Sequence, residues 1–448
     1  MSTSERTGHM KLGAFIHPTG NHLAAWLHPE ATIDAGTNVQ HYVDLARTAE
    51  RGKFDLLFLA DAVATRSGDM AALRRWPQYM CFFDPLTLLA ALATATSRIG
   101  LVATATTSYN EPYTLARRLA SLDHISAGRA GWNVVTSTNP WEAPNFGRDA
   151  HYGHAERYDR ALEFVDVFKG LLDSYDDDAF QRDRESGVYF DPDKLHVLDH
   201  KGASFSVRGP LNIARPPQGY PVLAAASASD RGMEVAAAVA EIVFSPLHSL
   251  EQAQAFSADI KARAAARGRN PDGIKVMPGL NPVMGDTEAE AKDKQAYLDS
   301  LIHEEVGRSL LQTALGGIDI SACLSDAPLP HSILQSGLET GHSEAKLVAA
   351  WSREGLTLRQ VYQRYGGARG QRSLVGTPVQ IADHMERWFR ARGVDGFLIQ
   401  PSVLPLDLGL FVDLVIPELQ NRGLFRSEYE GRTLRDNLGL DRPKSGYV

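Results

Sequence analysis

Apolar residues in this chain gather in short runs that alternate with stretches of helical periodicity. Eight runs have the length of strands that are buried on both faces of a sheet, and they cover residues 11–16, 54–60, 99–106, 130–135, 221–226, 242–244, 274–283 and 396–400. Apolar residues recur at helical spacing over 39–51, 85–96, 115–125, 155–172, 231–240, 250–266, 379–391 and 408–419. Eight strands interleaved with helices predict an α/β fold, a (β/α)₈ barrel of the TIM type.

The chain is longer than a minimal barrel requires. It has 448 residues, whereas a TIM-type barrel takes about 250, so we expect a single domain over 1–448 with insertions after the fourth and seventh strands. The larger insertion lies between Met284 and Gly376 and mixes helical segments with prolines and glycine pairs. Such a segment is typical of a lid over the barrel mouth.

An open, doubly wound sheet is the alternative architecture. The loop after the first strand lacks G-x-G-x-x-G, and G-x-x-x-x-G-K-[ST] does not occur in the chain. The stretch Gly366-Gly367-Ala368-Arg369-Gly370 has neither spacing. The nucleotide fingerprints of that architecture are therefore missing, which favours the barrel.

Charge and cysteine content exclude several classes of partner. The formal net charge is −8 and basic residues are scattered, which argues against nucleic acid and anionic lipid. No apolar run approaches the roughly 20 residues of a membrane span, and residues 1–10 are polar without a signal-peptide core, so we expect a cytoplasmic protein. Cys81 and Cys323 form no C-x-x-C pair, which indicates neither a disulfide framework nor a thiolate metal site.

Polar side chains stand where three of the expected strands end. Asp61, Thr104 and Asn133 occupy these positions, and side chains at the carboxyl ends of barrel strands line the active-site mouth. We therefore expect all three in the site. For Asp61, a simple loop cap is an equally good interpretation.

Two expected helix starts carry groups suited to an anion. His154 and Tyr158 are four residues apart at the start of one helix, so they share a face. Ser229 precedes another, where its hydroxyl and the following amides can hold a phosphate. Taken singly, each is explained by ordinary capping. Because both helices begin on the face where strands end, their convergence favours a phosphate site.

The loop after the first strand supplies His17, His22 and Trp26. It lies near the mouth, where a proton donor or a substrate-orienting group is needed, although a loop histidine is usually a surface residue. Neither H-x-H nor H-E-x-x-H occurs, so no metal site is indicated. A G-x-S-x-G elbow for a nucleophilic serine is also missing.

Long motifs follow one another from near the first strand to near the last residue. They are Gly20-Asn21-His22 with Trp26, Glu50-Arg51-Gly52-Lys53-Phe54-Asp55 through Asp61, Glu111-Pro112-Tyr113 through Ser126, Arg129 through Ser137, Asn145-Phe146-Gly147, His154 through Tyr158, Asp173 through Asp178, Arg208-Gly209-Pro210, Pro217-Gln218-Gly219 and Thr433-Leu434-Arg435-Asp436. Together they resemble the bacterial-luciferase-like flavin monooxygenases, in the two-component branch with nitrilotriacetate and dibenzothiophene-sulfone monooxygenases.

The resemblance implies a barrel that binds reduced FMN, delivered by a separate NAD(P)H:flavin reductase, and uses O₂ to oxygenate a small organic molecule such as a xenobiotic. Cleavage of a C–S, C–N or C–halogen bond or hydroxylation of carbon follows. The flavin-binding residues of the family match Asp61 and Thr104 near the isoalloxazine ring, and His154, Tyr158 and Ser229 near the phosphate. Asn133 joins this cofactor-binding set from its strand, and His22 is the catalytic candidate. By analogy we expect a homodimer or homotetramer.

Two departures from the family pattern bear on the substrate and the flavin. Ala225-Ala226-Ser227 stands where the branch commonly has Gln-Ala-Gly, which removes an amide that can affect how the ring is held. Ala314 stands where sulfone-cleaving members have a histidine, so we do not expect a dibenzothiophene sulfone as substrate. Two rival functions stay open: hydride transfer with a deazaflavin on the same barrel, and flavin binding without turnover.

Overall fold

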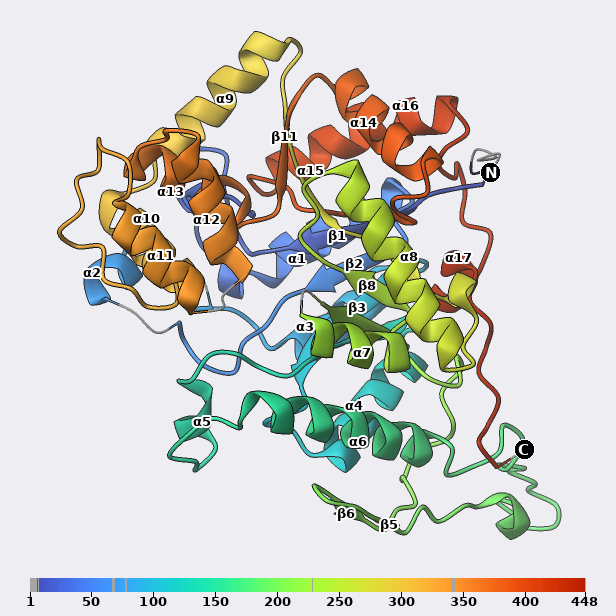
Figure 1. Cartoon of the computed structure of the whole chain (residues 1–448). Coiled ribbons are helices and arrows are strands. Elements are labelled where there is room, and N and C mark those ends of the chain that lie inside the picture. Colours follow the sequence, from blue (N-terminus) through green and yellow to red (C-terminus); the bar gives the residue numbers. More distant parts are fainter. Residues whose placement is uncertain are drawn as a thin grey trace.

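The computed structural model describes residues 6, 8–66, 69–76, 79–227, 229–340 and 343–447. The others, which include most of the polar segment 1–10, lie outside this description. A parallel sheet wrapped by helices forms the centre of the described part (Figure 1). Its barrel strands are β1 (Lys11–Ile16), β2 (Leu56–Leu59), β3 (Gly100–Thr106), β4 (Ala130–Val135), β7 (Val222–Ala226), β8 (Ile242–Phe244), β9 (Lys275–Val276), β10 (Gly279–Met284) and β12 (Gly396–Ile399).

A split strand closes the barrel. β9 pairs with β8, β10 pairs with β12, and only Met277 and Pro278 separate β9 from β10. The Met277 amide donates to the Val243 carbonyl at 2.9 Å, and the Leu398 amide donates to the Pro278 carbonyl at 2.9 Å. The predicted (β/α)₈ barrel is therefore confirmed. The single strand expected over 274–283 is corrected to two, because Pro278 has no amide hydrogen to continue the ladder.

Helices on the outside of the sheet follow the expected alternation. They are α1 (Val39–Arg51), α3 (Pro85–Ala95), α4 (Pro112–Ile125), α6 (His154–Leu172), α7 (Asp230–Val239), α8 (Leu250–Ala266), α14 (Pro378–Arg390), α15 (Leu406–Leu410) and α16 (Ile416–Asn421). The helix expected over 408–419 is interrupted by a π-helical turn, η5 (Phe411–Val415). Pro417 explains the interruption, because its ring removes a backbone donor just beyond the turn.

The amino-terminal end of the barrel is sealed from below by α17 (Leu434–Leu438). Leu434 and Leu438 pack into the apolar interior of the barrel with Phe58 and Val102. A Cβ on Gly100 would stand 2.4 Å from the Leu434 side chain, so β3 needs glycine at this contact. The motif Thr433-Leu434-Arg435-Asp436 is thus explained by packing.

Buried polar groups tie this seal to the sheet. Gln218 donates through Nε2 to Asp123 Oδ1 at 2.6 Å and accepts from the Arg435 amide at 3.0 Å. Asp123 also accepts from the Ala130 amide at 3.1 Å. The motif around Gln218 therefore serves the floor of the barrel, far from the carboxyl ends of the strands.

Arg129, just before β4, is buried and donates only to neighbouring chain segments. Its guanidinium bonds the Ser126 carbonyl at 2.7 Å, the Ala93 carbonyl at 2.8 Å, the Ile99 carbonyl at 2.9 Å, Thr96 Oγ1 at 2.9 Å and the Thr96 carbonyl at 3.1 Å. These acceptors belong to the end of α3, the start of β3 and the end of α4. Arg129 therefore holds three connections together beneath the sheet.

The segment between β10 and β12 forms a helical body with its own apolar core. It contains α9 (Glu288–Ser300), α10 (Glu304–Ala314), α11 (His331–Glu339), α12 (Ser343–Arg353), α13 (Leu358–Ala368) and β11 (Arg372–Gly376). Figure 1 shows α10 to α13 grouped on one side of the barrel. β11 pairs in parallel with β10 and was not predicted. Ala314 is buried within this core.

The segment between α6 and β7 carries a short antiparallel hairpin, β5 (His200–Lys201) and β6 (Ser206–Val207). The acidic run before it is fixed by arginines: Asp173, itself buried, accepts from Arg215 Nε at 2.9 Å, and Asp177 accepts from Arg442 Nη2 at 2.6 Å. The Arg215 pair lies within the insertion, and the Arg442 pair attaches the insertion to the chain beyond α17.

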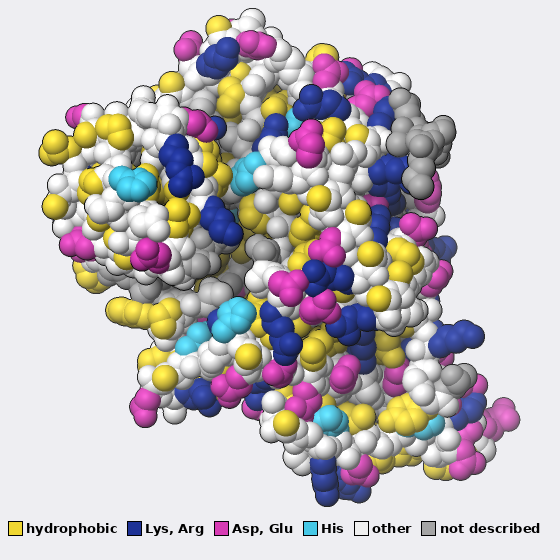
Figure 2. Space-filling view, in the orientation of Figure 1, with side chains coloured by type: hydrophobic (Ala, Val, Ile, Leu, Met, Phe, Trp, Pro, Cys, Tyr) yellow, Lys and Arg dark blue, Asp and Glu magenta, His cyan; other side chains and the backbone are white. Residues whose placement is uncertain are grey.

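None of the described helices has both the length and the apolar composition that a bilayer span requires. On the face in Figure 2, Lys and Arg are interspersed with Asp and Glu, and the surface is hollowed between the helical body and the barrel.

Candidate active site

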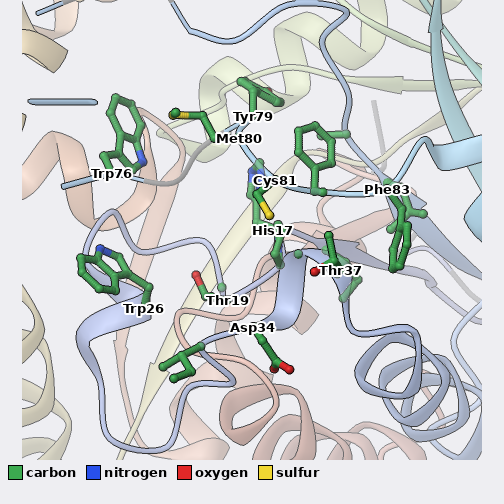
Figure 3. A pocket seen from close by; sticks show the side chains of 18 of the residues that line it. His17, Thr19, Trp26, Asp34, Thr37, Trp76, Tyr79, Met80, Cys81 and Phe83 are labelled. Atoms are coloured by element: carbon green, nitrogen blue, oxygen red, sulfur yellow. The ribbon is translucent and has the colours of Figure 1, made fainter. Parts of the chain in front are cut away.

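A cavity of about 470 Å³ lies at the carboxyl ends of β1 and β2. Its wall is mainly apolar and aromatic, with a few polar groups, as in sites for small organic ligands. Figure 3 shows His17, Trp26, Trp76, Tyr79, Met80 and Phe83 around it. Most of the wall comes from the loop after β1 and the segment after β2, and the helical insertion contributes Arg369.

Thr104 and Asn133 face each other across β3 and β4. Asn133 Nδ2 donates to Thr104 Oγ1 at 2.9 Å, and both side chains are buried. The Oδ1 of Asn133 is buried, and no described residue donates a hydrogen bond to it. A buried acceptor in this position is normally satisfied by a ligand or an ordered water, so the pair can receive a donor group.

Three hydroxyl groups, one from α6 and two from the connection between β7 and α7, converge over the start of α7. Ser229 caps α7, accepts from the Gly232 amide at 3.1 Å, and its Oγ lies 3.4 Å from the Tyr158 hydroxyl. A Cβ on Gly232 would lie 3.1 Å from Ser229 Oγ, 3.2 Å from Ser227 Oγ and 3.4 Å from the Tyr158 hydroxyl oxygen. The Ser227 hydroxyl is buried and has no partner within the described part of the chain. This hydroxyl cradle, formed by Tyr158, Ser227, Ser229 and Gly232, suits a phosphate at a helix start.

His154 completes the aromatic side of the cradle. Its ring packs edge-on against Tyr158, with 5.0 Å between ring centroids, and its side chain is exposed. The structure thus brings together His154, Tyr158 and Ser229, which the sequence placed on two separate helix starts.

Asp61 follows β2 beside the cavity, next to Leu59 and Ala60 in its wall. Burial raises the pKa of the Asp61 carboxyl to about 7, and the negative charges of Asp84 and Glu142 act in the same direction. The proton on this carboxyl therefore exchanges near neutral pH. The Ala62 amide donates to this carboxyl, as in a loop cap, and lowers its pKa, but burial has the larger effect.

The loop after β4 holds the segment after β2 in place. Asn139 Nδ2 donates to the Thr65 carbonyl at 3.1 Å, and Asn145 Nδ2 donates to the Val63 carbonyl at 3.1 Å. Asn145, within one of the family-like motifs, thereby helps to position the chain next to Asp61.

We expect Asp61 to make stability of the flavin-free protein pH-dependent. The folded chain holds a proton between about pH 4 and 7 that the unfolded chain releases, so stability falls as pH rises through this window and levels off above it. Asp61→Asn removes this term. The melting temperature of the variant, relative to that of the wild type, should therefore rise between pH 5 and pH 8. Asp286→Asn, at an exposed position, is the control; parallel pH profiles for Asp61→Asn and the wild type would disprove the assignment.

The cavity wall includes His22, but both of its ring nitrogens are engaged. Nε2 lies 3.2 Å from Asp299 Oδ1, and Nδ1 accepts from the Ala24 amide at 3.1 Å. The side chain is fully buried. In this geometry His22 connects the loop after β1 to α9 of the insertion. His17 also lines the cavity, and burial lowers the pKa of its imidazole well below the usual value, so it is neutral.

Other residues of the mouth escaped the sequence analysis. Ser227, Trp76 and Arg369 have buried polar atoms without partners among the described residues, and the buried Glu142 acts on the charge of Asp61. The sequence signal that could have pointed to Ser227 and Arg369 as site residues is that both lie in stretches of small residues. Ala225 packs in the outer core against α7, so the position of the missing Gln amide does not face the mouth.

These groups fit reduced FMN. β7, β4, β3, β2 and β1 are successive neighbours in the sheet, so the cradle, the Thr104–Asn133 pair, Asp61 and the cavity follow one another along the rim. This order matches an elongated ligand with a phosphate at one end and a ring system at the other. In the described part of the chain, no group of His, Cys, Asp and Glu side chains is arranged to hold a metal ion.

A parallel barrel with such a rim defines a class of flavin enzyme, and the comparison with known proteins agrees. Residues 14–396 match the family model described as luciferase-like monooxygenase. The chain therefore belongs to the luciferase-like monooxygenase family. It is a flavin-dependent monooxygenase that uses reduced FMN and O₂ on a small organic substrate.

Similar proteins cover nearly the whole chain. N-acetyl-S-(2-succino)cysteine monooxygenase of Bacillus subtilis (strain 168) is 48% identical over 440 residues, 98% of each chain. Nitrilotriacetate monooxygenase component A of Aminobacter aminovorans is 47% identical, over 97% of each chain. A riboflavin lyase solved with modified FMN and riboflavin is 30% identical, with a TM-score of 0.85 over 97% of each chain. The resemblance to the two-component branch is confirmed.

Proposed function

We propose that this chain is the oxygenase component of a two-component system. It takes reduced FMN from a separate NAD(P)H:flavin reductase and oxygenates a small organic molecule, with cleavage of a C–S, C–N or C–halogen bond or hydroxylation of carbon. The similarity to a protein named as component A supports a partner reductase. The main support from the geometry is the hydroxyl cradle, which shares the barrel mouth with a largely apolar cavity.

In this proposal the phosphate of FMN binds at the cradle. The hydroxyls of Ser227, Ser229 and Tyr158 and the first amides of α7 donate to it, while the helix dipole favours its charge. Asn133 and Thr104 contact the ring system, and Asp61 stands at its far end. Reduced FMN, when bound, supplies the electrons that activate O₂.

The remaining residues control water and protons. The aromatic wall of the cavity excludes water from the reacting groups, which prevents unproductive side reactions. With a pKa of about 7, Asp61 can hold or release a proton at its carboxyl during turnover. His22 acts in this proposal as a positioning residue that fixes the loop after β1 through Asp299.

We further propose that residues 284–376 act as the lid of a single-domain enzyme. Arg369 lines the cavity and Asp299 contacts His22, so the insertion contacts the mouth at two places. By analogy with other barrels, the enzyme is a cytoplasmic homodimer or homotetramer. Ala314 lies in the core of the insertion, which supports a substrate other than a dibenzothiophene sulfone.

Anaerobic titration with reduced FMN tests the proposed function. Ser229→Ala and Tyr158→Phe should each weaken binding by about 1 to 3 kcal/mol, because each removes a hydrogen bond to a charged group. Ser249→Ala is the matched control, because Ser249 caps α8 in the same way, by accepting from the Gln252 amide at 3.2 Å, but stands outside the hydroxyl cradle. Unchanged affinity in both cradle variants would remove the phosphate assignment. Failure of the wild type to bind reduced FMN would refute the function.

A further inference from the structure

Arg369 reaches the cavity from the end of α13. Its backbone is left-handed, with φ of 50°, and directs the chain from α13 towards β11. Nε donates to the Asn21 carbonyl at 2.7 Å, which anchors the guanidinium to the loop after β1. The Nη1 atom is buried and has no hydrogen-bond partner among the described residues. One donor of a cationic group is therefore left open at the wall of the cavity.

No acidic side chain is among the described groups that have the largest effect on the pKa of Arg369. Burial lowers the pKa of the Arg369 guanidinium to about 10, and the positive charge of Arg66 also lowers it, while Tyr79 raises it. A buried cation of this kind is strongly unfavourable unless an anion approaches it. The cavity is thus electrostatically prepared for a negative group.

Trp76 adds a second open donor on the same wall. Its ring lies 5.8 Å from the Arg369 guanidinium carbon and 4.2 Å from that of Arg66. The indole Nε1 of Trp76 is buried, and none of the residues that the structure describes bonds it. Trp26, also in the wall, differs because its indole donates to the Arg75 carbonyl at 3.0 Å. Of these two tryptophans, the one beside the two guanidiniums is therefore the one with an unbonded indole N–H in the described part of the chain.

Most of the rest of the wall is apolar, although Thr19, Thr37, Arg74 and Arg75 also line it, and this part suits an apolar group. Phe82, Phe83 and Leu88 line it together with Ile16 and Leu59. The acidic side chain of the wall is Asp34, which is exposed; Figure 3 shows it on the side of the cavity away from Trp76. The wall beside Arg369 and Trp76 is thus cationic, and the remainder is mainly hydrophobic.

We propose that the substrate is an organic acid whose carboxylate is bound by Arg369 Nη1 and Trp76 Nε1 and whose apolar part fills the aromatic end. This inference rests on the proposed function, because it assigns the substrate class of the same mouth. The phosphate of FMN is accommodated separately at the hydroxyl cradle, on a different strand end. A guanidinium and an indole N–H together present donors that fit the two oxygens of a carboxylate.

Calorimetry with matched acid and amide probes tests the proposal on the full chain saturated anaerobically with reduced FMN. The probes are 3-(benzylsulfanyl)propanoate and N-acetyl-S-benzylcysteine, each with its primary amide. The wild type should bind each acid roughly 10- to 100-fold more tightly than its amide. Arg369→Gln should abolish this preference by weakening only the acids, and Trp76→Phe should reduce it several-fold.

Two further variants keep the test decisive. Arg369→Lys retains the charge without the planar fork, so it should keep part of the preference even if Arg369→Gln fails to fold. Arg353→Gln, at an exposed position on α12, should leave every affinity unchanged. Equal binding of acids and amides by a wild type that holds reduced FMN, or a full acid preference in Arg369→Gln, would overturn the proposal and leave the proposed function intact. Loss of reduced FMN binding by the wild type itself would instead refute the function.

Discussion

Gly232→Ala is expected to lower the affinity for reduced FMN about 100-fold while leaving the fold intact. The new methyl would stand 3.1 to 3.4 Å from the hydroxyl oxygens of Ser229, Ser227 and Tyr158, so it pushes apart the three groups assigned to the phosphate. Disturbing two hydrogen bonds to a charged ligand is worth about 3 kcal/mol, which corresponds to this factor. The measurement is the same anaerobic titration, accompanied by thermal unfolding.

The effect on stability should have the opposite sign or be small. Gly232 lies within α7, and alanine is favoured over glycine inside a helix by up to about 1 kcal/mol. Gly409→Ala is the matched control, because Gly409 also lies in a helix, α15, and its added methyl would meet open space. Weakened FMN binding without a lower melting temperature supports the cradle. Wild-type affinity in Gly232→Ala would show that the phosphate binds elsewhere.

Arg129→Ala is expected to lower the free energy of unfolding by about 3 kcal/mol. The substitution leaves the carbonyls of Ala93, Thr96, Ile99 and Ser126 without their donor in a buried place, and such a loss is strongly destabilising. Denaturant unfolding followed by circular dichroism measures the change. Arg117→Ala, at an exposed position on α4, should alter stability by less than about 0.5 kcal/mol.

A different outcome for Arg129 would change its interpretation. The residue opens a motif shared with the family, and a role in flavin binding predicts loss of FMN affinity at normal stability. The structure places its donors against the ends of α3 and α4, below the sheet, so we expect the reverse. A stable Arg129→Ala protein that no longer binds reduced FMN would contradict the structural role.

The barrel could be predicted from the sequence because parallel strands that are buried on both faces leave continuous apolar runs. β1, β4 and β8 begin and end where the pattern predicted. β11 was missed because it lacks such an apolar run. Residues 372–375 are partly buried or exposed, and the strand is held by backbone pairing with β10. The break at Met277–Pro278 was overlooked because apolar residues continue through it.

The candidate site was predictable where helix starts and strand ends carry local signals. The hydroxyls of Tyr158 and Ser229 are separated by 71 positions in the chain, yet both meet on the rim because each stands at a helix start on the same side of the sheet. Trp76 had no such signal, and Arg369 had only its place in a glycine-rich stretch. The contact between Arg369 and Trp76 depends on how α13 packs against the segment after β2. The pattern of side chains along a single element does not show how two elements pack.

His22 illustrates a second limit. Its position after β1 correctly suggested the mouth, but a sequence does not show which ring nitrogens are already bonded. Asp299, which engages Nε2, comes from α9 in a distant segment. The role of such a histidine is decided by partners that only the folded chain brings to it.

The seal beneath the barrel has a consequence for biosynthesis. β1 pairs with β12, Asp55 is bonded by Arg426, and Leu434 fills the interior under β3. At ribosomal rates of about 5 to 20 residues per second, roughly tens of seconds separate the emergence of β1 from that of these partners. During this interval the early strands expose unpaired edges and apolar faces, so the yield of folded protein in a producing cell should depend on the supply of chaperones. Lowering the growth temperature should improve the yield only if it slows aggregation more than it slows synthesis.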